Sequence, residues 1–183
     1  MISRPMPALL LLFALLLPLA AHGESRTHDV ILESDSGESI VIGSVTFSAD
    51  GDGDQFRFTM DDSKFSDQFL SMRPFKCLDG DTMVCHLAYP YERMMKIQTG
   101  DLADLEYEFL FIARSPTEYG IDPYNGRYFV LENTDDGYVG TVHAVDLNIL
   151  AAPPEVGNLR PITPADLDLL EPESERFPRL RIR

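Results

Sequence analysis

Most of the chain after residue 23 consists of short segments in which apolar and polar residues alternate between turn-forming residues. Residues 39–48 are rich in isoleucine and valine, and residues 56–60 alternate strictly between apolar and polar side chains. Residues 133–137 carry a hairpin signal that ends in Asp-Gly. Because alternation with a period of two is typical of half-buried strands, the chain is expected to be mainly β.

About eight short strands are expected, and their connections are mostly of hairpin length. The candidate segments are residues 30–33, 39–48, 56–60, 84–89, 92–98, 105–112, 128–132 and 139–150. This spacing favours an antiparallel sandwich or a barrel-like sheet. We therefore predict a single β-rich domain over residues 24–152, which is long enough to bury a hydrophobic core.

One or two short helices and a basic tail are expected around this sheet. The first helix would begin at residue 62 or 63 and end before Pro74, and the second would run from Thr163 to about Leu170. Residues 153–183 would form a connector, this second helix and a peripheral C-terminal tail rich in arginine. The tail is expected to pack on the domain, since the two carry opposite charge; a free arm that seeks an acidic partner is the alternative.

The charge balance excludes several functions. The chain has 30 acidic and 15 basic residues, which gives a net charge of −15. Such a protein repels phosphate backbones and anionic lipid, so we expect no nucleic-acid partner. Tryptophan is absent, which also excludes a site built on a stacking indole.

The first 23 residues are typical of a secretory signal peptide. Arg4 precedes an apolar run over residues 8–19, and small residues occupy Ala21 and Gly23. Cleavage is expected between Gly23 and Glu24, although an uncleaved anchor is the alternative. No second long apolar run follows, so we expect no membrane insertion after cleavage and a periplasmic or extracellular location. The absence of an Asn-X-Ser/Thr sequon favours a bacterial exported protein.

Cys77 and Cys85 are the only cysteines. An even count in an oxidising compartment predicts a disulfide across the seven residues between them. A redox-active pair is the alternative, but such pairs usually have Cys-X-X-Cys spacing at the start of a helix. We therefore expect a structural cross-link.

The region around the two cysteines also suggests a ligand site. Cations and tyrosines lie close together there, and a second aromatic loop follows at residues 119–127. The candidate ligand-binding residues are Arg73, Lys76, His86, Tyr89, Tyr91, Arg93 and Tyr124. Cations can bind an anionic group between tyrosine walls. Alternatively, these cations pair with the surplus acidic residues around them.

A short acidic segment resembles the start of a calcium loop. Asp50, Asp52 and Asp54 alternate with glycines that let a chain curl around a cation. The spacing departs from an EF-hand, since Gln55 stands where glycine is needed and Asp61 where glutamate is needed. Calcium is thus a possible cofactor, and a solvated hairpin tip is the alternative.

Catalytic signatures are weak. His28, His86 and His143 follow residue 23, without the local spacing of a metal site, and no Gly-X-Ser-X-Gly is present. Three functions remain open. The first is an exported, non-catalytic binding or interaction protein for an unknown small molecule or protein. The second is a hydrolase that assembles its site from distant histidine and acidic residues, and the third is a calcium-stabilised structural or adhesion domain.

Overall fold

The computed structural model describes residues 25–183, so the expected signal peptide and its cleavage point lie outside the described residues. Twelve strands form one antiparallel sheet, and its neighbours run in the order β4-β5-β6-β8-β9-β10-β12-β1-β2-β3-β7, with β11 paired to β10. The expected mainly β, antiparallel fold is therefore confirmed. The expected number of strands was too small, and the sheet is not closed.

The strands differ greatly in length. The longer ones are β1 (Ser25–Glu33), β2 (Ser39–Asp50), β3 (Gly53–Met60), β9 (Gly126–Thr134) and β10 (Gly137–Val145). The shorter ones are β4 (Ser66–Phe69), β5 (Pro74–Leu78), β6 (Met83–His86), β7 (Lys96–Ile97), β8 (Phe111–Arg114), β11 (Leu167–Leu169) and β12 (Arg179–Ile182). One short α-helix, α1 (Ala103–Glu106), continues into a 3₁₀ turn at Tyr107–Phe109.

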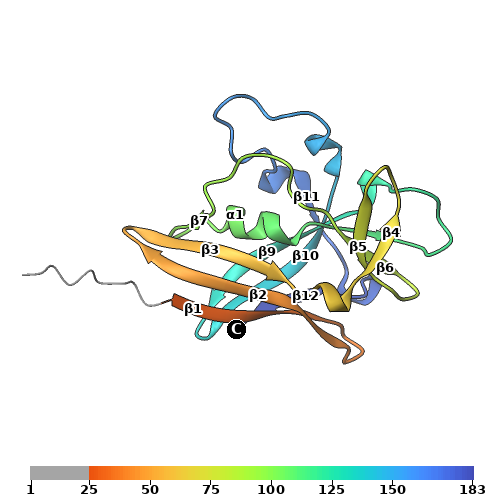
Figure 1. Ribbon diagram of the computed structural model, residues 1–183, viewed down its shortest axis with the longest axis horizontal. Helices are drawn as coiled ribbons and strands as arrows, with labels where there is room; N and C mark the ends of the chain where they lie inside the picture. The colour runs from red at the N-terminus through yellow and green to blue at the C-terminus, as the bar shows by residue number, and fades with distance from the viewer. Residues whose placement is uncertain (1–24) are drawn as a thin grey trace, which may run out of the picture.

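The sheet curls so that its two halves face each other. Figure 1 shows β1, β2 and β3 lying across β9 and β10, with α1 beside them. The rings of Phe47 on β2 and Tyr138 on β10 lie 5.7 Å apart, although β12 and β1 separate these strands in the sheet. Likewise, Phe58 on β3 lies 6.4 Å from His86 on β6. The space between the halves is filled by a buried apolar core.

The expected peripheral tail is instead an inner strand. β12 pairs with β10 on one side and with β1 on the other. Leu180 and Ile182 are fully buried, while Arg179 and Arg181 on the opposite face pair with Asp35 and Glu33. The basic segment does dock on its own domain, but alternation of Leu and Ile with Arg makes it a sheet strand rather than a surface arm.

The segment over residues 105–112 also differs from expectation, because only its last two residues, Phe111 and Ile112, belong to a strand, β8. Leu105 and Phe109 are four residues apart and both enter the main core, whereas Tyr107 and Leu110 enter a second cluster. A helical turn between two apolar clusters buries side chains on both sides. The alternating sequence therefore fits a helix spacing as well as a strand.

Neither expected helix forms as such. Asp62–Lys64 and Pro164–Asp166 are single 3₁₀ turns, and each leads into a strand. Phe69 lies within the range expected for the first helix and is 80% exposed on β4. The β5–β6 hairpin offers β4 a partner strand, and this pairing prevails over the weak helical pattern.

Candidate functional site

A cavity of about 780 Å³ lies beside α1. Its walls come from α1, from β9 and from the segment that leads to β11. The lining residues are Gly100, Asp101, Leu102, Ala103, Glu106, Tyr128, Val130, Leu131, Glu132, Asn133, Arg160, Ile162, Thr163, Pro164 and Leu167. The size and the largely apolar walls are those of a small-molecule site.

Glu106 is the most unusual polar residue of this cavity. One carboxylate oxygen accepts a hydrogen bond from the backbone N–H of Leu131 at 2.8 Å, and the other accepts one from the hydroxyl of Tyr128 at 2.5 Å. Burial raises the pKa of the Glu106 carboxyl, and these two bonds oppose that rise. The α1 turn thus places a carboxyl with a raised pKa against β9.

Tyr128 belongs to a row of buried tyrosines. Its ring meets Tyr107 edge-on at 6.1 Å, and Tyr107 stacks on Tyr89 at 4.5 Å. Burial raises the pKa of Tyr107 to about 12. Burial, together with the facing Glu106, also raises the pKa of Tyr128. The Tyr128 phenol therefore remains protonated and acts as the donor to Glu106.

Arg160 joins the cavity wall to α1. Its guanidinium contacts Asp101 at 3.0 Å and Asp104 at 2.5 Å. Asp104 is fully buried, so Arg160 compensates a charge that would otherwise be costly inside the protein. Both ion pairs fix the segment around residue 160 over the helix and so shape the cavity.

The candidate ligand-binding residues do not converge on one site. Arg73 is exposed at the β4–β5 turn, and Lys76 on β5 contacts Asp67 at 3.0 Å. Tyr124 is 70% exposed in a separate 3₁₀ turn. None of the seven candidates lines the large cavity.

Four of those candidates do lie together, in a packed region. His86 Nε2 is 2.9 Å from the backbone oxygen of Glu108, and Arg93 contacts the Glu108 carboxylate at 2.9 Å. Arg93 also lies over the Tyr89 ring, 5.7 Å from its centroid. The Tyr91 hydroxyl donates to the backbone oxygen of Leu150 at 2.6 Å. These contacts favour the alternative in which the cations pair with nearby acids.

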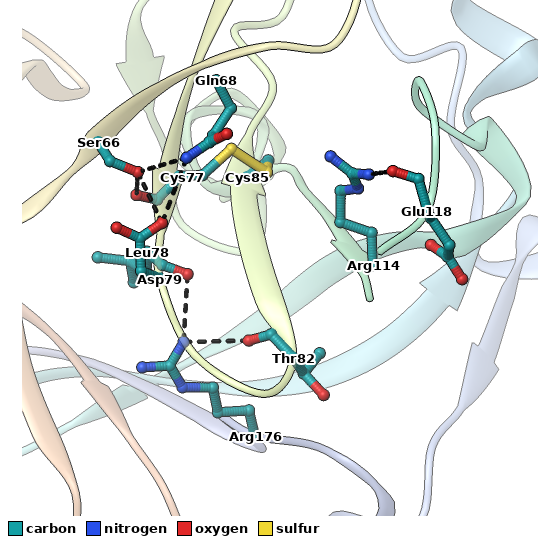
Figure 2. Close-up of a disulfide and its surroundings, with 10 residues drawn as sticks. All are labelled: Ser66, Gln68, Cys77, Leu78, Asp79, Thr82, Cys85, Arg114, Glu118 and Arg176. Atoms are coloured by element: carbon teal, nitrogen blue, oxygen red, sulfur yellow. Dashed lines mark hydrogen bonds between the residues drawn. A yellow bond between two sulfur atoms is a disulfide. The ribbon is translucent and has the colours of Figure 1, made fainter. Parts of the chain in front are cut away.

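Cys77 and Cys85 form a disulfide, as expected from the sequence. They face each other across β5 and β6, and both are fully buried. Figure 2 shows Arg176 donating to the backbone oxygens of Leu78 and Thr82 beside this cross-link, at 3.2 and 3.0 Å. The disulfide hairpin is thus bound to the segment that precedes β12.

The expected calcium loop is the turn between β2 and β3. Lys96 contacts Asp52 at 2.7 Å and Asp50 at 3.6 Å, and Arg26 pairs with Asp54. Over residues 25–183, no group of three or more histidine, cysteine or acidic side chains is arranged to hold a metal ion. The three carboxylates are therefore bound by protein cations, which fits the hairpin-tip alternative.

None of the three histidines of the described residues lines the large cavity. His143 is 3.0 Å from the backbone oxygen of Thr141, and His86 packs between β3 and β8. His143 is half-buried and lies on the same face of β10 as Val145 of the second cluster, whereas Val142 on the other face enters the main core. Burial lowers the pKa of His86, which keeps its ring neutral at physiological pH.

Sequence reasoning missed Glu106, Tyr128 and Arg160. The one usable signal was Glu106 itself, an acidic residue within the apolar segment over residues 105–112. Arg160 and Tyr128 carry no local signal, since their role depends on contacts made across 22 or more residues.

Comparisons with protein-family models, with curated proteins and with solved structures returned no match. Among residues 25–183, no helix has the length and apolar character required to cross a membrane.

Proposed function

We propose that the protein is an exported, non-catalytic binding protein that takes a small molecule with an apolar body into the cavity beside α1. The observation that carries this proposal is a cavity of about 780 Å³ whose walls include Ala103, Val130, Ile162 and Leu167. A buried disulfide and the sequence of residues 1–23 support export, because disulfides persist in oxidising compartments.

The polar groups of the cavity favour binding over catalysis. Glu106 accepts hydrogen bonds at both oxygens, and Arg160 is held by two aspartates. A general acid or base needs an oxygen or nitrogen that can reach the reacting atom. Here these groups are committed to the wall itself, and they hold it in shape.

The test uses N-phenyl-1-naphthylamine, a neutral probe whose fluorescence rises in apolar surroundings. We expect saturable binding to the wild type. Val130→Phe places a ring over the apolar wall of the cavity and should weaken binding by about tenfold or more, because the probe cannot occupy the same space as the added ring. Val41→Phe is the matched control, since Val41 is 39% exposed on β2 and does not line the cavity.

The proposal is overturned if the wild type does not bind the probe, or if both phenylalanine variants bind it equally well. Export is tested separately on the protein made in a bacterial host. The secreted chain should begin near Glu24 and show no alkylatable thiol before reduction. An intact precursor with two reactive thiols would contradict export.

A further inference from the structure

We infer that the ligand of this cavity carries a positive charge next to its apolar body, as in a protonated aralkyl amine. This inference rests on the proposed function and adds the ligand class. It follows from where the charges of the cavity lie relative to its apolar walls.

Acidic side chains outnumber basic ones around the cavity. Asp101, Glu106 and Glu132 line it, whereas Arg160 is the one cation among its lining residues. Arg160 is also bound by Asp104, which is buried just behind the wall. The three-residue cluster of Arg160 and its two aspartates therefore still carries a net negative charge, and Glu132 adds a second one.

These negative charges lie where a ligand would enter. Glu132 is exposed, and the Asp101 side chain is 41% exposed. By contrast, Ile162 and Leu131 are buried in the wall, 6% exposed each. The cavity thus presents carboxylates at its mouth and apolar side chains further in, which matches a molecule with a cationic head and an apolar body.

The same arrangement disfavours two other ligand classes. A free metal ion needs several converging ligands, and no group of three or more suitable side chains is assembled over residues 25–183. An anionic ligand would face uncompensated carboxylates in a chain whose net charge is −15. Neither a bare cation nor an anion fits both the mouth and the walls.

The carboxylates at the mouth of the cavity are exposed, and this exposure limits how strongly the cavity prefers a cationic ligand to a neutral one. Charges near a protein surface interact through a high effective dielectric and are screened by salt. We therefore expect a cationic ligand to bind about five- to tenfold more tightly than a neutral one of the same shape, and an anionic one to bind correspondingly more weakly.

The test is displacement of N-phenyl-1-naphthylamine by three molecules that share one aromatic body. These are 1-naphthylmethylamine, which is protonated at pH 7, the neutral 1-naphthylmethanol and the anionic carboxylate 1-naphthaleneacetate. At low salt the amine should displace the probe at the lowest concentration and the acetate at the highest. The differences between the displacing concentrations of the three competitors should become smaller as sodium chloride is raised to 0.5 M. Salt screens the carboxylates at the mouth, because the Debye length shortens (about 3 Å at 1 M).

Two variants locate the preference at the mouth. Glu132→Gln removes a lining carboxylate. It should reduce the ratio of the affinity for the amine to the affinity for the alcohol by about half or more. Glu173→Gln is the matched control, because Glu173 is exposed in the turn Pro172–Ser174 and does not line this cavity. It should leave the ratio unchanged.

Failure of this inference is distinct from failure of the proposed function. If the neutral probe binds and Val130→Phe blocks it, the cavity is a binding site whatever the charge result. Equal displacement by the three competitors, stronger displacement by the acetate, or an equal effect of both glutamine variants would overturn the charge preference. The predicted order together with a selective loss in Glu132→Gln would support it.

Discussion

At the scale of single residues, the most informative group is the Glu106 carboxyl. Its raised pKa means that the folded protein holds a proton on Glu106 in a pH range where the unfolded chain has released it. Protonated Glu106 therefore contributes stability that is fully present below the unfolded pKa and is lost as the pH rises through the folded pKa. Each unit by which the folded pKa exceeds the unfolded one corresponds to about 1.4 kcal/mol.

Glu106→Gln removes this titration and leaves a neutral side chain of similar shape. We expect the free energy of unfolding of the variant, relative to the wild type, to increase as the pH rises from about 4 to 8. Urea unfolding at several pH values measures it, with Glu173→Gln as a control for the loss of one negative charge. Stability curves for wild type and Glu106→Gln that stay parallel over this range would contradict the assignment.

The Tyr128 hydroxyl is the donor that stabilises the Glu106 carboxylate. Tyr128→Phe leaves one carboxylate oxygen without its partner in a mostly buried position, so we expect a loss of about 1–3 kcal/mol at pH 7. Tyr119→Phe is the matched control, because Tyr119 is fully exposed and its hydroxyl should contribute little. Chemical denaturation compares the two, and an equal effect of both substitutions would contradict this role.

At the scale of elements, the disulfide holds β5 against β6. It closes a loop with a sequence separation of eight, for which the chain-entropy estimate is about 2.6 kcal/mol. We expect the double variant Cys77→Ala/Cys85→Ala to lose at least about 2 kcal/mol, with a larger denaturant m value because its unfolded chain is more expanded.

Leu78→Ala provides a comparison for that experiment, since Leu78 is buried next to Cys77 but forms no cross-link. It should lower stability through lost packing without raising the m value. An unchanged m value in the double cysteine variant would show that the cross-link does not restrict the unfolded chain.

The sequence predicted those elements whose information is local. The β2–β3 and β9–β10 hairpins follow from alternating segments around aspartate- and glycine-rich turns, and the disulfide follows from an even count of two cysteines separated by seven residues. Residues 105–110 were assigned wrongly because apolar side chains on both sides of a segment fit a strand and a helix equally. Local spacing does not decide between the two when both faces are buried.

The cavity depends on contacts that no local pattern encodes. Glu106 meets Tyr128, and Arg160 meets Asp104 across 56 residues of chain. The sequence left two interpretations of the cationic cluster around the cysteines, a ligand site or pairing with nearby acids, and Lys76 and Arg93 are in fact bound to neighbouring acidic residues. In a strongly acidic chain, such pairing is available to almost every cation, so a local basic cluster is weak evidence for a site.

At the scale of the whole molecule, β12 decides whether there is one sheet or two. Without it, β1 and β10 would lose their common neighbour, and the β1–β2–β3–β7 half would be separated from the rest. The pairing of β12 joins residues about 150 positions apart, such as Val30 and Ile182. Contacts of this separation make folding slow and tie the two halves into one cooperative unit.

Leu180→Ala tests this coupling, because Leu180 is fully buried between the two halves. We expect a loss of about 2–5 kcal/mol, with β1 and β10 unfolding in the same transition as β12. The matched control is Leu169→Ala on β11, where the leucine is 70% exposed and should contribute less than about 0.5 kcal/mol. Chemical denaturation measures the loss of stability, and hydrogen exchange at increasing denaturant shows which strands unfold together. Amides of β1 that keep their protection in Leu180→Ala while those of β12 lose it would show that the halves are stable independently.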